Sequence, residues 1–411
     1  MNALLVRLTA AAISVFASAV NSYGQAPPAA PPPDVVTSSA GNIRVERLAT
    51  LEFPWGLALL PDGRLLVTEK PGRLRVWAGG KLSEPLQGVP SVVNLRPGEQ
   101  GGLLDVKVDP DFARNGFVYL SYSEAAEQQS SGVTDTGDMR FGRLAGSQDN
   151  VIRGGAVARA RLVGDRLTDL QVIWRQTPKT VGRGHFGNRM AFGPDGKLYI
   201  ASGDRMRFEP AQNPASNLGK VVRINTDGSV PADNPFVGRE GARDDVWSLG
   251  HRNILSLAFD SAGRLWAFEM GPLGGDEVNL VAKGENYGWP LVSNGDNYNG
   301  RDFTNPPIPD HPTRREFREP VRTWTPVVSP SGSIFYSGSL FQGWRGSALV
   351  GGLSSQAIVR LGFDGGRIAI EERINMGRRV RDLIQAPDGS LYVIVDAEKG
   401  DLLRLSPAAQ R

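Results

Sequence analysis

The three histidines are the residues from which this sequence can build an acid–base site. His185 stands in the glycine-rich run GRGHFGN, where small neighbours let a ligand approach the backbone closely. An imidazole titrates near neutrality, so His185 is a candidate general base; the alternative is a loop histidine that bonds a carbonyl. His251 is followed by Arg252 and Asn253, whereas His311 lies in a proline-rich loop and is predicted to be at the surface.

Further polar side chains stand immediately before apolar runs. Gln100 lies in the run EQGGLL, and Arg379 and Arg381 lie in the run RRVRD. The two arginines are two positions apart, so they share one face if this segment is a strand. If that face points to a ligand, two guanidiniums favour an anion, above all carboxylates gripped in a bidentate manner. The alternative is that both arginines are solvated surface residues.

The densest group of oxygen donors lies in residues 269–279 (EMGPLGGDEVN), followed by NYGWP at 286–290. Gly-Pro and Gly-Gly steps expose backbone carbonyls, and Asp276, Glu277 and Asn279 carry side-chain oxygens. Ca²⁺ takes many oxygen ligands, several of them from the backbone. The segment is therefore a candidate calcium loop, although it matches no EF-hand spacing. The alternative is an acidic turn without a metal.

Several common sites are absent from the sequence. It contains no cysteine, which excludes disulfides, thiolate metal sites and cysteine nucleophiles. It also lacks the G-x-S-x-G, P-loop and H-E-x-x-H motifs. The run GRGHFG spells G-x-G-x-x-G, but it leads into a strand-like segment, which disfavours a dinucleotide-binding fold. A net charge of +3 gives no reason to expect a nucleic-acid partner.

The elements that must position these residues form an internal repeat. An apolar run, a turn such as Pro-Asp-Gly and a second apolar run recur six times. Each copy is predicted to be a β-hairpin, because Asp-Gly supplies the positive φ of a tight turn. The repeat favours an all-β fold, a six-bladed β-propeller with long loops, over a β-sandwich or two barrels. The copies span residues 57–68, 106–121, 190–202, 257–268, 333–351 and 383–395.

The first residues have the pattern of an export signal. An arginine precedes an uncharged, mostly apolar run at 8–20, and small residues follow it. The alternative, a membrane anchor, is disfavoured because about 20 apolar residues are needed to span a bilayer. We therefore expect a signal peptide at 1–24, a proline-rich linker at 25–40 and the propeller at 41–411. The mature protein would then be periplasmic or secreted, without a membrane span.

Taken in order, these motifs resemble the soluble pyrroloquinoline quinone (PQQ)-dependent aldose sugar dehydrogenases of the glucose/sorbosone dehydrogenase family. The resemblance runs from about residue 51 to residue 405. The motifs that carry it are FPWG (53–56), QGGLLD (100–105), HFG (185–187), GHRN (250–253), GP (271–272) with GDEVN (275–279), NYGWP (286–290) and RVRD (379–382). The family is built as a six-bladed propeller, in agreement with the repeat.

The resemblance implies a reaction and the residues that perform it. His185 would take the proton of the anomeric hydroxyl while hydride leaves C1 of an aldose for the quinone, which yields a lactone. Arg252 would stabilise the charge that develops on reduction. An external acceptor would receive the electrons, and the protein would be a monomer or a dimer. The residues implied to bind PQQ are Gln100, His185, Arg252, Asn253, Arg379 and Arg381.

The resemblance also implies two Ca²⁺ sites. The carbonyls of Gly271 and Pro272 would hold the ion that contacts PQQ and polarises the quinone. Glu277 and the carbonyl of Tyr287 match a second, structural site.

Three positions depart from the family pattern. Gly184 stands where the glucose dehydrogenases have an aspartate before the catalytic histidine, so another group must orient His185. Ser354 replaces a lysine that touches PQQ, and Met270 replaces a histidine. Two alternatives stay open. One is a Ca²⁺-dependent propeller hydrolase of the lactonase type, which the arginines and Gln100 before the strands disfavour. The other is a carbohydrate-binding propeller that has lost its cofactor, which Ser354 favours. Sugar preference is expected to depend on the long inserts at 124–156 and 291–318.

Overall fold

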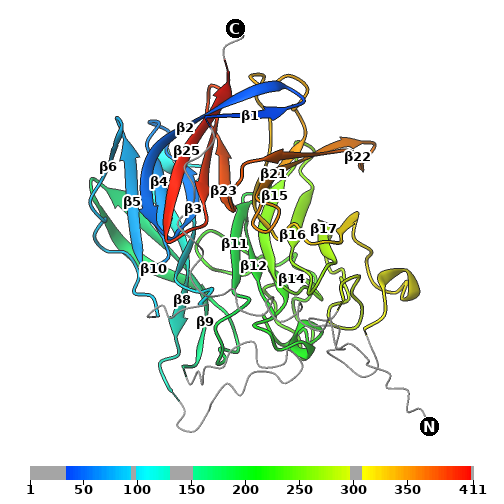
Figure 1. The fold of residues 1–411 in the computed structure, drawn as a ribbon. Coiled ribbons are helices and arrows are strands. Elements are labelled where there is room, and N and C mark those ends of the chain that lie inside the picture. Colours follow the sequence, from blue (N-terminus) through cyan, green and yellow to red (C-terminus); the bar gives the residue numbers. More distant parts are fainter. Residues whose placement is uncertain (1–33, 94–98, 130–150, 297–307, 409–411) are drawn as a thin grey trace, which may run out of the picture.

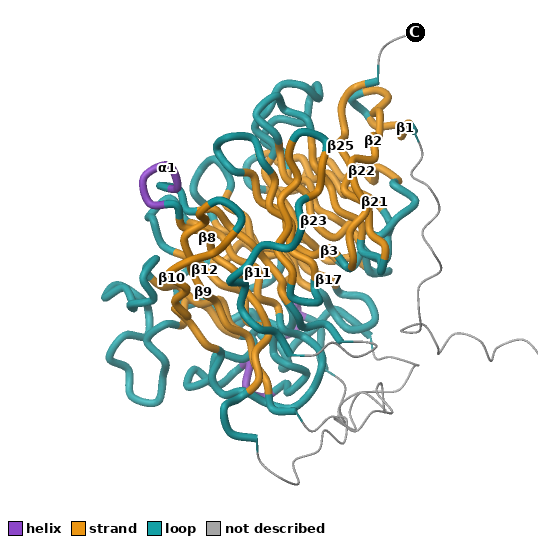
Figure 2. Tube along the Cα trace, turned by 90° about the vertical axis from the view of Figure 1, so that its left-hand side faces the viewer, coloured by secondary structure: helices purple, strands orange, loops and turns teal. Residues whose placement is uncertain are grey.

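The computed structural model describes residues 34–93, 99–129, 151–296 and 308–408. The predicted signal peptide and parts of both long inserts lie outside these residues. The described chain forms six antiparallel sheets, or blades, arranged in a ring (Figure 1). In the view of Figure 2 the strands gather in the middle of the molecule, with loops at their ends.

The blades are numbered in chain order, and the strands of each blade are given from the innermost outward. Blade 1 contains β3 (Pro54–Leu59), β4 (Leu65–Glu69), β5 (Arg73–Ala78) and β6 (Lys81–Leu82). Blade 2 contains β7 (Leu103–Val108), β8 (Phe117–Ala125), β9 (Arg153–Val163) and β10 (Arg166–Arg175). Blade 3 contains β11 (Gly187–Phe192), β12 (Leu198–Ser202), β13 (Lys220–Ile224) and β14 (Val246–Leu249).

Blades 4 to 6 complete the ring. Blade 4 contains β15 (Ile254–Phe259), β16 (Leu265–Glu269), β17 (Asp276–Val281) and β18 (Arg322–Trp324). Blade 5 contains β19 (Pro330–Phe335), β20 (Ala348–Gly352), β21 (Ala357–Asp364) and β22 (Arg367–Asn375). Blade 6 contains β23 (Val380–Gln385), β24 (Leu391–Val395), β25 (Lys399–Pro407), β2 (Gly41–Glu52) and β1 (Val35–Ser38). The described helices are short: α1 (Phe112–Asn115), η2 (Glu209–Ala211) and η4 (His311–Thr313).

The ring is closed by strands from both parts of the chain. The inner strands β3, β7, β11, β15, β19 and β23 pack against one another in this order, and β23 packs against β3. Farther out in blade 6, β2 from the N-terminal part pairs with β25 from the C-terminal part (Figure 1). The six-bladed propeller predicted from the repeat is therefore confirmed.

All six predicted hairpins are the inner two strands of the blades. Gly63 and Gly196 in the first and third copies have φ of 86° and 71°, values that glycine adopts without strain. The predicted limits of the linker need a correction: β1 lies within 25–40 and pairs with β2, so the sheet begins earlier in the chain than residue 41. Although β1 is short, its residues alternate between exposed and buried, as expected of a strand added to the edge of blade 6.

A buried arginine ties the inner strands together near the axis of the ring. Arg189 on β11 bonds Asp382 of blade 6 at 2.9 Å and Asp105 of blade 2 at 3.3 Å. It also donates to the carbonyls of Leu255 in blade 4 and Trp55 in blade 1, at 3.0 and 3.4 Å. Its guanidinium lies 3.9 Å from the centre of the Trp55 ring. Five of the six blades therefore meet at this side chain.

Strand direction brings two sets of loops to one end of the ring. Neighbouring strands in a blade are antiparallel, as in the pairs β11–β12 and β23–β24. The loop that leads into an inner strand therefore lies at the same end as the loop that leaves the second strand. We call this end the mouth face. No helix among the described residues is long and apolar enough to cross a membrane.

Candidate active site

His185 and Asp204 form a buried hydrogen-bonded pair on the mouth face. His185 leads into β11 with a backbone φ of 50°, and Asp204 follows β12. Nδ1 of His185 lies 2.7 Å from Oδ1 of Asp204, and the histidine side chain is 7% exposed. Because the carboxylate accepts this bond, the proton of the neutral ring resides on Nδ1, and Nε2 keeps a free lone pair. Such a nitrogen can accept a proton.

Further donors fix the carboxylate of Asp204. Its Oδ1 also accepts a bond of 2.8 Å from the backbone N–H of Met206. Its Oδ2 accepts a bond of 2.8 Å from Nε1 of Trp289. The backbone N–H of Asp204 donates to the carbonyl of Arg252 at 2.8 Å. The group that orients His185 is therefore itself anchored to blade 4.

The electrostatics favour a neutral imidazole beside an ionised carboxylate. Burial lowers the pKa of His185 and the positive charge of Arg252 lowers it further, while Asp204 opposes both. Burial works to raise the pKa of Asp204, but His185, Arg252 and the N–H of Met206 hold it below its usual value. At neutral pH the imidazole is therefore unprotonated at Nε2 and available as an acceptor for a proton from a ligand.

Gln100 lies next to this pair, as the position of its loop predicts. Its Oε1 accepts a bond of 2.9 Å from the backbone N–H of His185, and its own N–H donates to the carbonyl of Arg183 at 2.9 Å. Within the described chain, no group bonds the Nε2 amide of Gln100. The amide hydrogens of this exposed residue remain available to a ligand.

Arg252 and Asn253 lead into β15 and are buried on the mouth face. Nη1 of Arg252 donates to the carbonyls of Met270 and Gly271 at 2.9 and 2.8 Å. Its guanidinium also lies 5.4 Å from the centre of the Trp289 ring. Nε of Arg252 and Oδ1 of Asn253 are buried without a hydrogen-bond partner in the described chain. Buried polar atoms without partners are uncommon and indicate a missing ligand or water.

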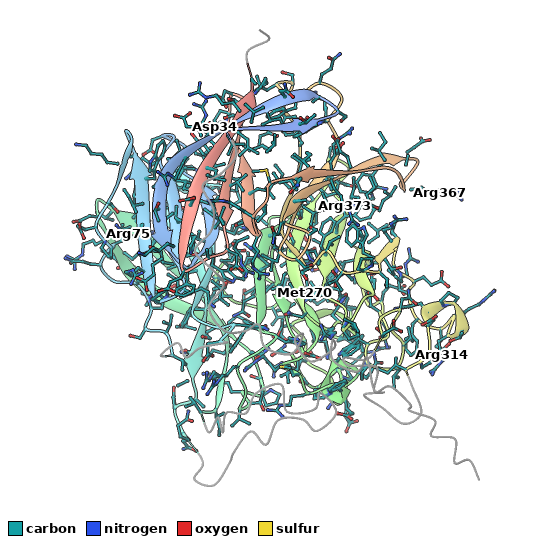
Figure 3. All side chains as sticks on the ribbon, viewed as in Figure 1. Asp34, Arg75, Met270, Arg314, Arg367 and Arg373 are labelled. Atoms are coloured by element: carbon teal, nitrogen blue, oxygen red, sulfur yellow. The ribbon has the colours of Figure 1, made fainter. Side chains whose placement is uncertain are left out.

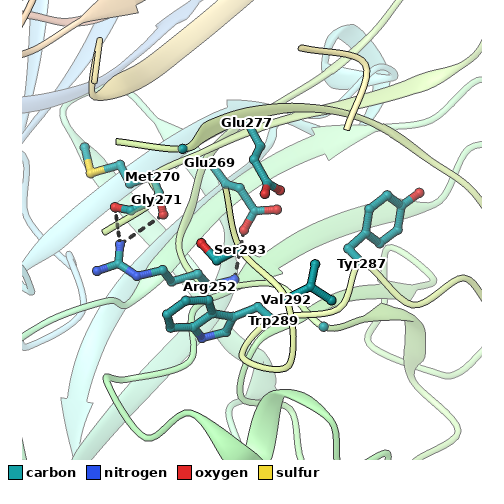
Figure 4. Close-up of a pocket in the computed structure, with 11 residues that line it drawn as sticks. Arg252, Glu269, Met270, Gly271, Glu277, Tyr287, Trp289, Val292 and Ser293 are labelled. Carbon is teal, nitrogen blue, oxygen red and sulfur yellow. Dashed lines mark hydrogen bonds between the residues drawn. The ribbon is translucent and has the colours of Figure 1, made fainter. Parts of the chain in front are cut away.

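A small cavity borders Arg252 (Figure 4). It has a volume of about 10 Å³, which is room for one water molecule or one ion. The carboxylates of Glu269 and Glu277 face it, together with Ser293 (Figure 4). Tyr287 also borders the cavity, but its hydroxyl points away and donates to the carbonyl of Leu280 at 2.6 Å.

A buried polar network supports the two carboxylates. Oε1 of Glu269 accepts bonds from Nδ1 of His251 at 3.0 Å and from Asn279 at 2.8 Å. Asn279 also donates to Oε2 of Glu277 at 2.9 Å. Nε2 of His251 bonds the hydroxyl of Ser248 at 2.9 Å. His251 therefore bonds a residue that lines the cavity, whereas His185 lies on the mouth face.

The prediction that His311 lies at the surface is wrong. His311 begins η4, and its side chain is only 2% exposed. Its Nε2 lies 3.2 Å from Oε1 of Glu277. The prolines on either side predict an irregular loop but give no information about what the loop packs against. Here that loop returns to blade 4 and buries the imidazole against the carboxylate.

Arg379 and Arg381 lie together, as their spacing predicts, and share one carboxylate. Nη2 of each arginine lies 2.7 Å from the carboxylate of Asp396, which follows β24. Arg379 is 41% exposed and Arg381 is 11% exposed. Two cations with one anion between them leave an excess of positive charge on the mouth face.

Gly271 and Pro272 lie in the loop that leaves β16, and Met270 beside them lies near the middle of the molecule (Figure 3). A side chain at Gly271 would collide with the carbonyl oxygens of Gly274 and Gly275. The absence of a side chain therefore leaves a space bordered by carbonyl oxygens. The carbonyl of Gly271 accepts its bond from Arg252, so an ion at this oxygen would lie beside a guanidinium.

The three positions that depart from the family pattern have local explanations. A Cβ at Gly184 would lie 2.6 Å from Sδ of Met206, so a larger residue there requires Met206 to move. The hydroxyl of Ser354 bonds the carbonyl of Val327 and the hydroxyl of Ser329, at 3.1 and 2.9 Å. Met270 is partly buried and packs against an apolar cluster that includes Phe186.

The sequence motifs did not identify the polar residues that follow the second strand of each of three blades. These residues are Lys70 after β4, Asp204 after β12 and Asp396 after β24. The same hairpin that predicts His185 at the mouth also brings Asp204 there, because Gly187 at the start of β11 pairs with Ser202 at the end of β12. The repeat register was therefore the signal that could have found them.

The chain is similar to known proteins over most of its length. A family model described as glucose / sorbosone dehydrogenase matches residues 51–404. The aldose sugar dehydrogenase YliI of Escherichia coli is 38% identical over 376 residues, which cover 90% of this chain and 94% of the relative.

Solved structures show the same similarity. The apo-form of the soluble aldose sugar dehydrogenase from Escherichia coli is 36% identical with a TM-score of 0.77, covering 89% of this chain and 100% of that one. The PQQ-bound form of an aldose sugar dehydrogenase from Streptomyces coelicolor is 27% identical with a TM-score of 0.65, covering 92% of this chain and 99% of that one.

Proposed function

The chain belongs to the glucose/sorbosone dehydrogenase family, and we propose that it is a PQQ-dependent aldose sugar dehydrogenase. Its reaction would oxidise an aldose at C1 to the corresponding lactone and pass the electrons to an external acceptor. The observation that carries the proposal is the bond of 2.7 Å between His185 and Asp204 on the mouth face. A PQQ-bound relative that matches almost the whole described fold supports the choice of cofactor.

In this proposal His185 is the general base. Asp204 holds the proton on Nδ1, so Nε2 accepts the proton of the anomeric hydroxyl. PQQ, when bound, supplies the acceptor for the hydride that leaves C1. Arg252, whose charge already lowers the pKa of His185, keeps the imidazole neutral until it receives the proton and favours negative charge that develops near its guanidinium.

The residues on the mouth face fit a flat polyanion. Arg379 and Arg381 would bind its carboxylates, because within the described residues the two share the single carboxylate of Asp396. The free amide of Gln100 and the unpartnered Nε of Arg252 would donate to its oxygens. Asn253 lies beside Arg252 and would bind the same group.

The oxygen atoms in blade 4 fit Ca²⁺ at two places. The carbonyls of Gly271 and Pro272, in a loop where carbonyl oxygens crowd, would hold an ion that polarises the quinone as a Lewis acid when bound. Glu277 and Tyr287 border the small cavity, and the carboxylate of the first and the carbonyl of the second would hold a structural ion.

The two alternatives fit the same residues less well. A lactonase-type hydrolase needs space for a substrate beside an ion held by carboxylates, and the cavity between Glu269 and Glu277 has a volume of only about 10 Å³. A binding protein without a cofactor would have no need for a base whose Nδ1 is held by a buried carboxylate. The uncharged Ser354 remains the feature that favours this second alternative.

We also propose that the enzyme acts outside the cytoplasm. The reason is the pattern of a signal peptide at 1–24 and of a linker that follows it. N-terminal sequencing of the protein recovered from the periplasm or the medium tests this placement. A chain that keeps residue 1 and stays in the cytoplasm would contradict it.

One experiment tests the proposed function. The purified protein is mixed with PQQ and Ca²⁺, and reduction of a dye acceptor is followed with glucose, maltose, xylose and arabinose. Gel filtration then measures whether PQQ absorbance stays with the protein. We expect dye reduction with at least one aldose and retained absorbance. Absence of both would reject the proposal, and retained PQQ without turnover would favour the binding protein.

A further inference from the structure

Lys70 is a cation of the mouth face that has no role in the site described so far. It follows β4 in blade 1, and its Nζ donates to the carbonyl of Glu99 at 2.7 Å. Its backbone is fixed on both sides: its N–H donates to Phe53 and its carbonyl accepts from Leu103, each at 3.0 Å. The ammonium also lies 5.9 Å from the centre of the Phe53 ring. Lys70 is therefore held between the entrances of blades 1 and 2.

The charged groups that face Lys70 do not neutralise it. They are Arg381 and Asp396 of blade 6 and Glu99 of blade 2. Asp396 already serves Arg379 and Arg381, and the carboxylate of Glu99 bonds Arg153 at 2.5 Å. Among the described residues, the cations Lys70, Arg379 and Arg381 therefore face a single carboxylate, that of Asp396, which is not paired with Arg153. A ligand with two or more negative charges would balance them.

The environment of Lys70 already acts against its positive charge. The pKa of Lys70 is lowered to about 8: burial and then the charge of Arg381 lower it, while Asp396 and Glu99 act in the opposite direction. A bound carboxylate would favour the ammonium and raise the pKa again. Binding of an anion is thus expected to be linked to uptake of a proton at pH values above about 8.

We propose that Lys70 binds a carboxylate of the polyanionic cofactor together with Arg379 and Arg381. In this chain the additional cation then comes from blade 1, not from position 354 in blade 5. Ser354 has no charge, and its hydroxyl is already bonded to Val327 and Ser329. The inference rests on the proposed function, since it names a further residue for the same ligand.

The test is PQQ binding, without turnover, by isothermal titration calorimetry of the Ca²⁺-loaded protein. Titrations in two buffers with different protonation enthalpies give the number of protons taken up. The variants are Lys70→Met, which removes the charge, and Lys70→Arg, which keeps a charge that does not titrate. Lys81→Met on β6, an exposed lysine outside the mouth face, is the matched control.

At about pH 9, one unit above the pKa of Lys70, we expect the wild type and Lys81→Met to take up part of a proton on binding. Lys70→Met should bind PQQ roughly 10- to 100-fold more weakly and without that uptake. Lys70→Arg should bind nearly as tightly as the wild type, also without uptake. Lys70→Arg keeps the test valid if Lys70→Met does not fold.

Two other outcomes distinguish a failure of the inference from a failure of the proposed function. If the wild type binds PQQ and both Lys70 variants show the same affinity and the same proton uptake, the inference is wrong and the proposed function stands. If the wild type does not bind PQQ at all, the proposed function itself fails and the inference fails with it.

Discussion

Oδ1 of Asp204 accepts a hydrogen bond from Nδ1 of His185 at 2.7 Å, although 19 residues separate the two in the chain. The pairing of Gly187 with Ser202 in blade 3 explains the contact, because it places the start of β11 beside the end of β12. The inner hairpin of the blade thus positions both the proposed base and the carboxylate that bonds its ring. Position 184 carries no aspartate in this chain. Asp204, which follows the other strand of the same hairpin, bonds the histidine in its place.

The first prediction concerns this pair. Asp204→Asn should lower kcat roughly 100- to 10,000-fold, since an amide does not hold the proton on Nδ1 as a carboxylate does. The dissociation constant of PQQ should change little, because His185 contacts Asp204 from the side opposite to its Nε2. Dye reduction gives kcat, and equilibrium dialysis gives the dissociation constant.

Asp388→Asn is the matched control, because Asp388 lies in the turn between β23 and β24, at the end of the blade away from the mouth face. Its kcat should equal that of the wild type. If Asp204→Asn turns over at the wild-type rate, the orientation of His185 by Asp204 has no catalytic role.

Local turn chemistry is what made the fold predictable from the sequence. Asp-Gly turns such as those ending in Gly63 and Gly389 need a positive φ, and the flanking apolar runs show which strands are buried. Once six hairpins are recognised, the residues that precede each inner strand fall on one face. His185 and Arg252 could be placed at the site for this reason.

The rest of the site needs more than a motif. Asp396 and Lys70 belong to no motif, and the register of the hairpin repeat is the signal that places them on the mouth face. His311 was misplaced for another reason: the prolines beside it describe the loop, whereas its burial depends on Glu277, 34 residues earlier in the chain.

The second prediction is the acid limit of activity. The base must be neutral, so kcat/KM falls when the pH drops through the pKa of His185. Burial and Arg252 lower that pKa, so activity should persist below pH ~6.5, the usual value for histidine, and decline only in more acidic buffer. A pH profile of kcat/KM with a neutral sugar measures the limit.

Arg252→Gln supplies the check on the cause. Loss of the guanidinium removes a charge that lowers the pKa of His185, so the imidazole should titrate at higher pH in this variant. NMR titration of the three histidine rings reads this shift without turnover. An unchanged titration would show that Arg252 does not act on His185.

The third prediction concerns the arginine at the axis of the ring. Arg189→Met should lower the free energy of unfolding by about 3–5 kcal/mol, because it leaves buried Asp105 and Asp382 without their shared cation. Denaturant titration measures the change. Arg64→Met, which breaks an exposed pair with Asp62, should stay within about 0.5 kcal/mol of the wild type. Equal effects of the two substitutions would contradict the role of Arg189.

The fourth prediction concerns the small cavity of blade 4. If Glu277 and the carbonyl of Tyr287 hold Ca²⁺, a chelator should lower the midpoint of thermal unfolding, and added Ca²⁺ should restore it. Glu277→Gln should unfold at a lower temperature and respond much less to either addition. Glu285→Gln, at an exposed position of the loop that carries Tyr287, should respond like the wild type. A Glu277→Gln protein with the full wild-type response would exclude Glu277 as a ligand.

The fifth prediction separates binding of the cofactor from catalysis. Arg379→Ala should raise the dissociation constant of PQQ roughly 10- to 100-fold, since a charged group that faces a carboxylate is lost. At saturating PQQ its kcat should remain near the wild-type value, because Arg379 bonds Asp396 and has no contact with the pair of His185 and Asp204 among the described residues. Arg367→Ala on β22, at the periphery of the molecule in Figure 3, is the matched control and should change neither quantity. A fall in kcat at full saturation would mean that Arg379 acts on the reaction itself and not only on the affinity for PQQ.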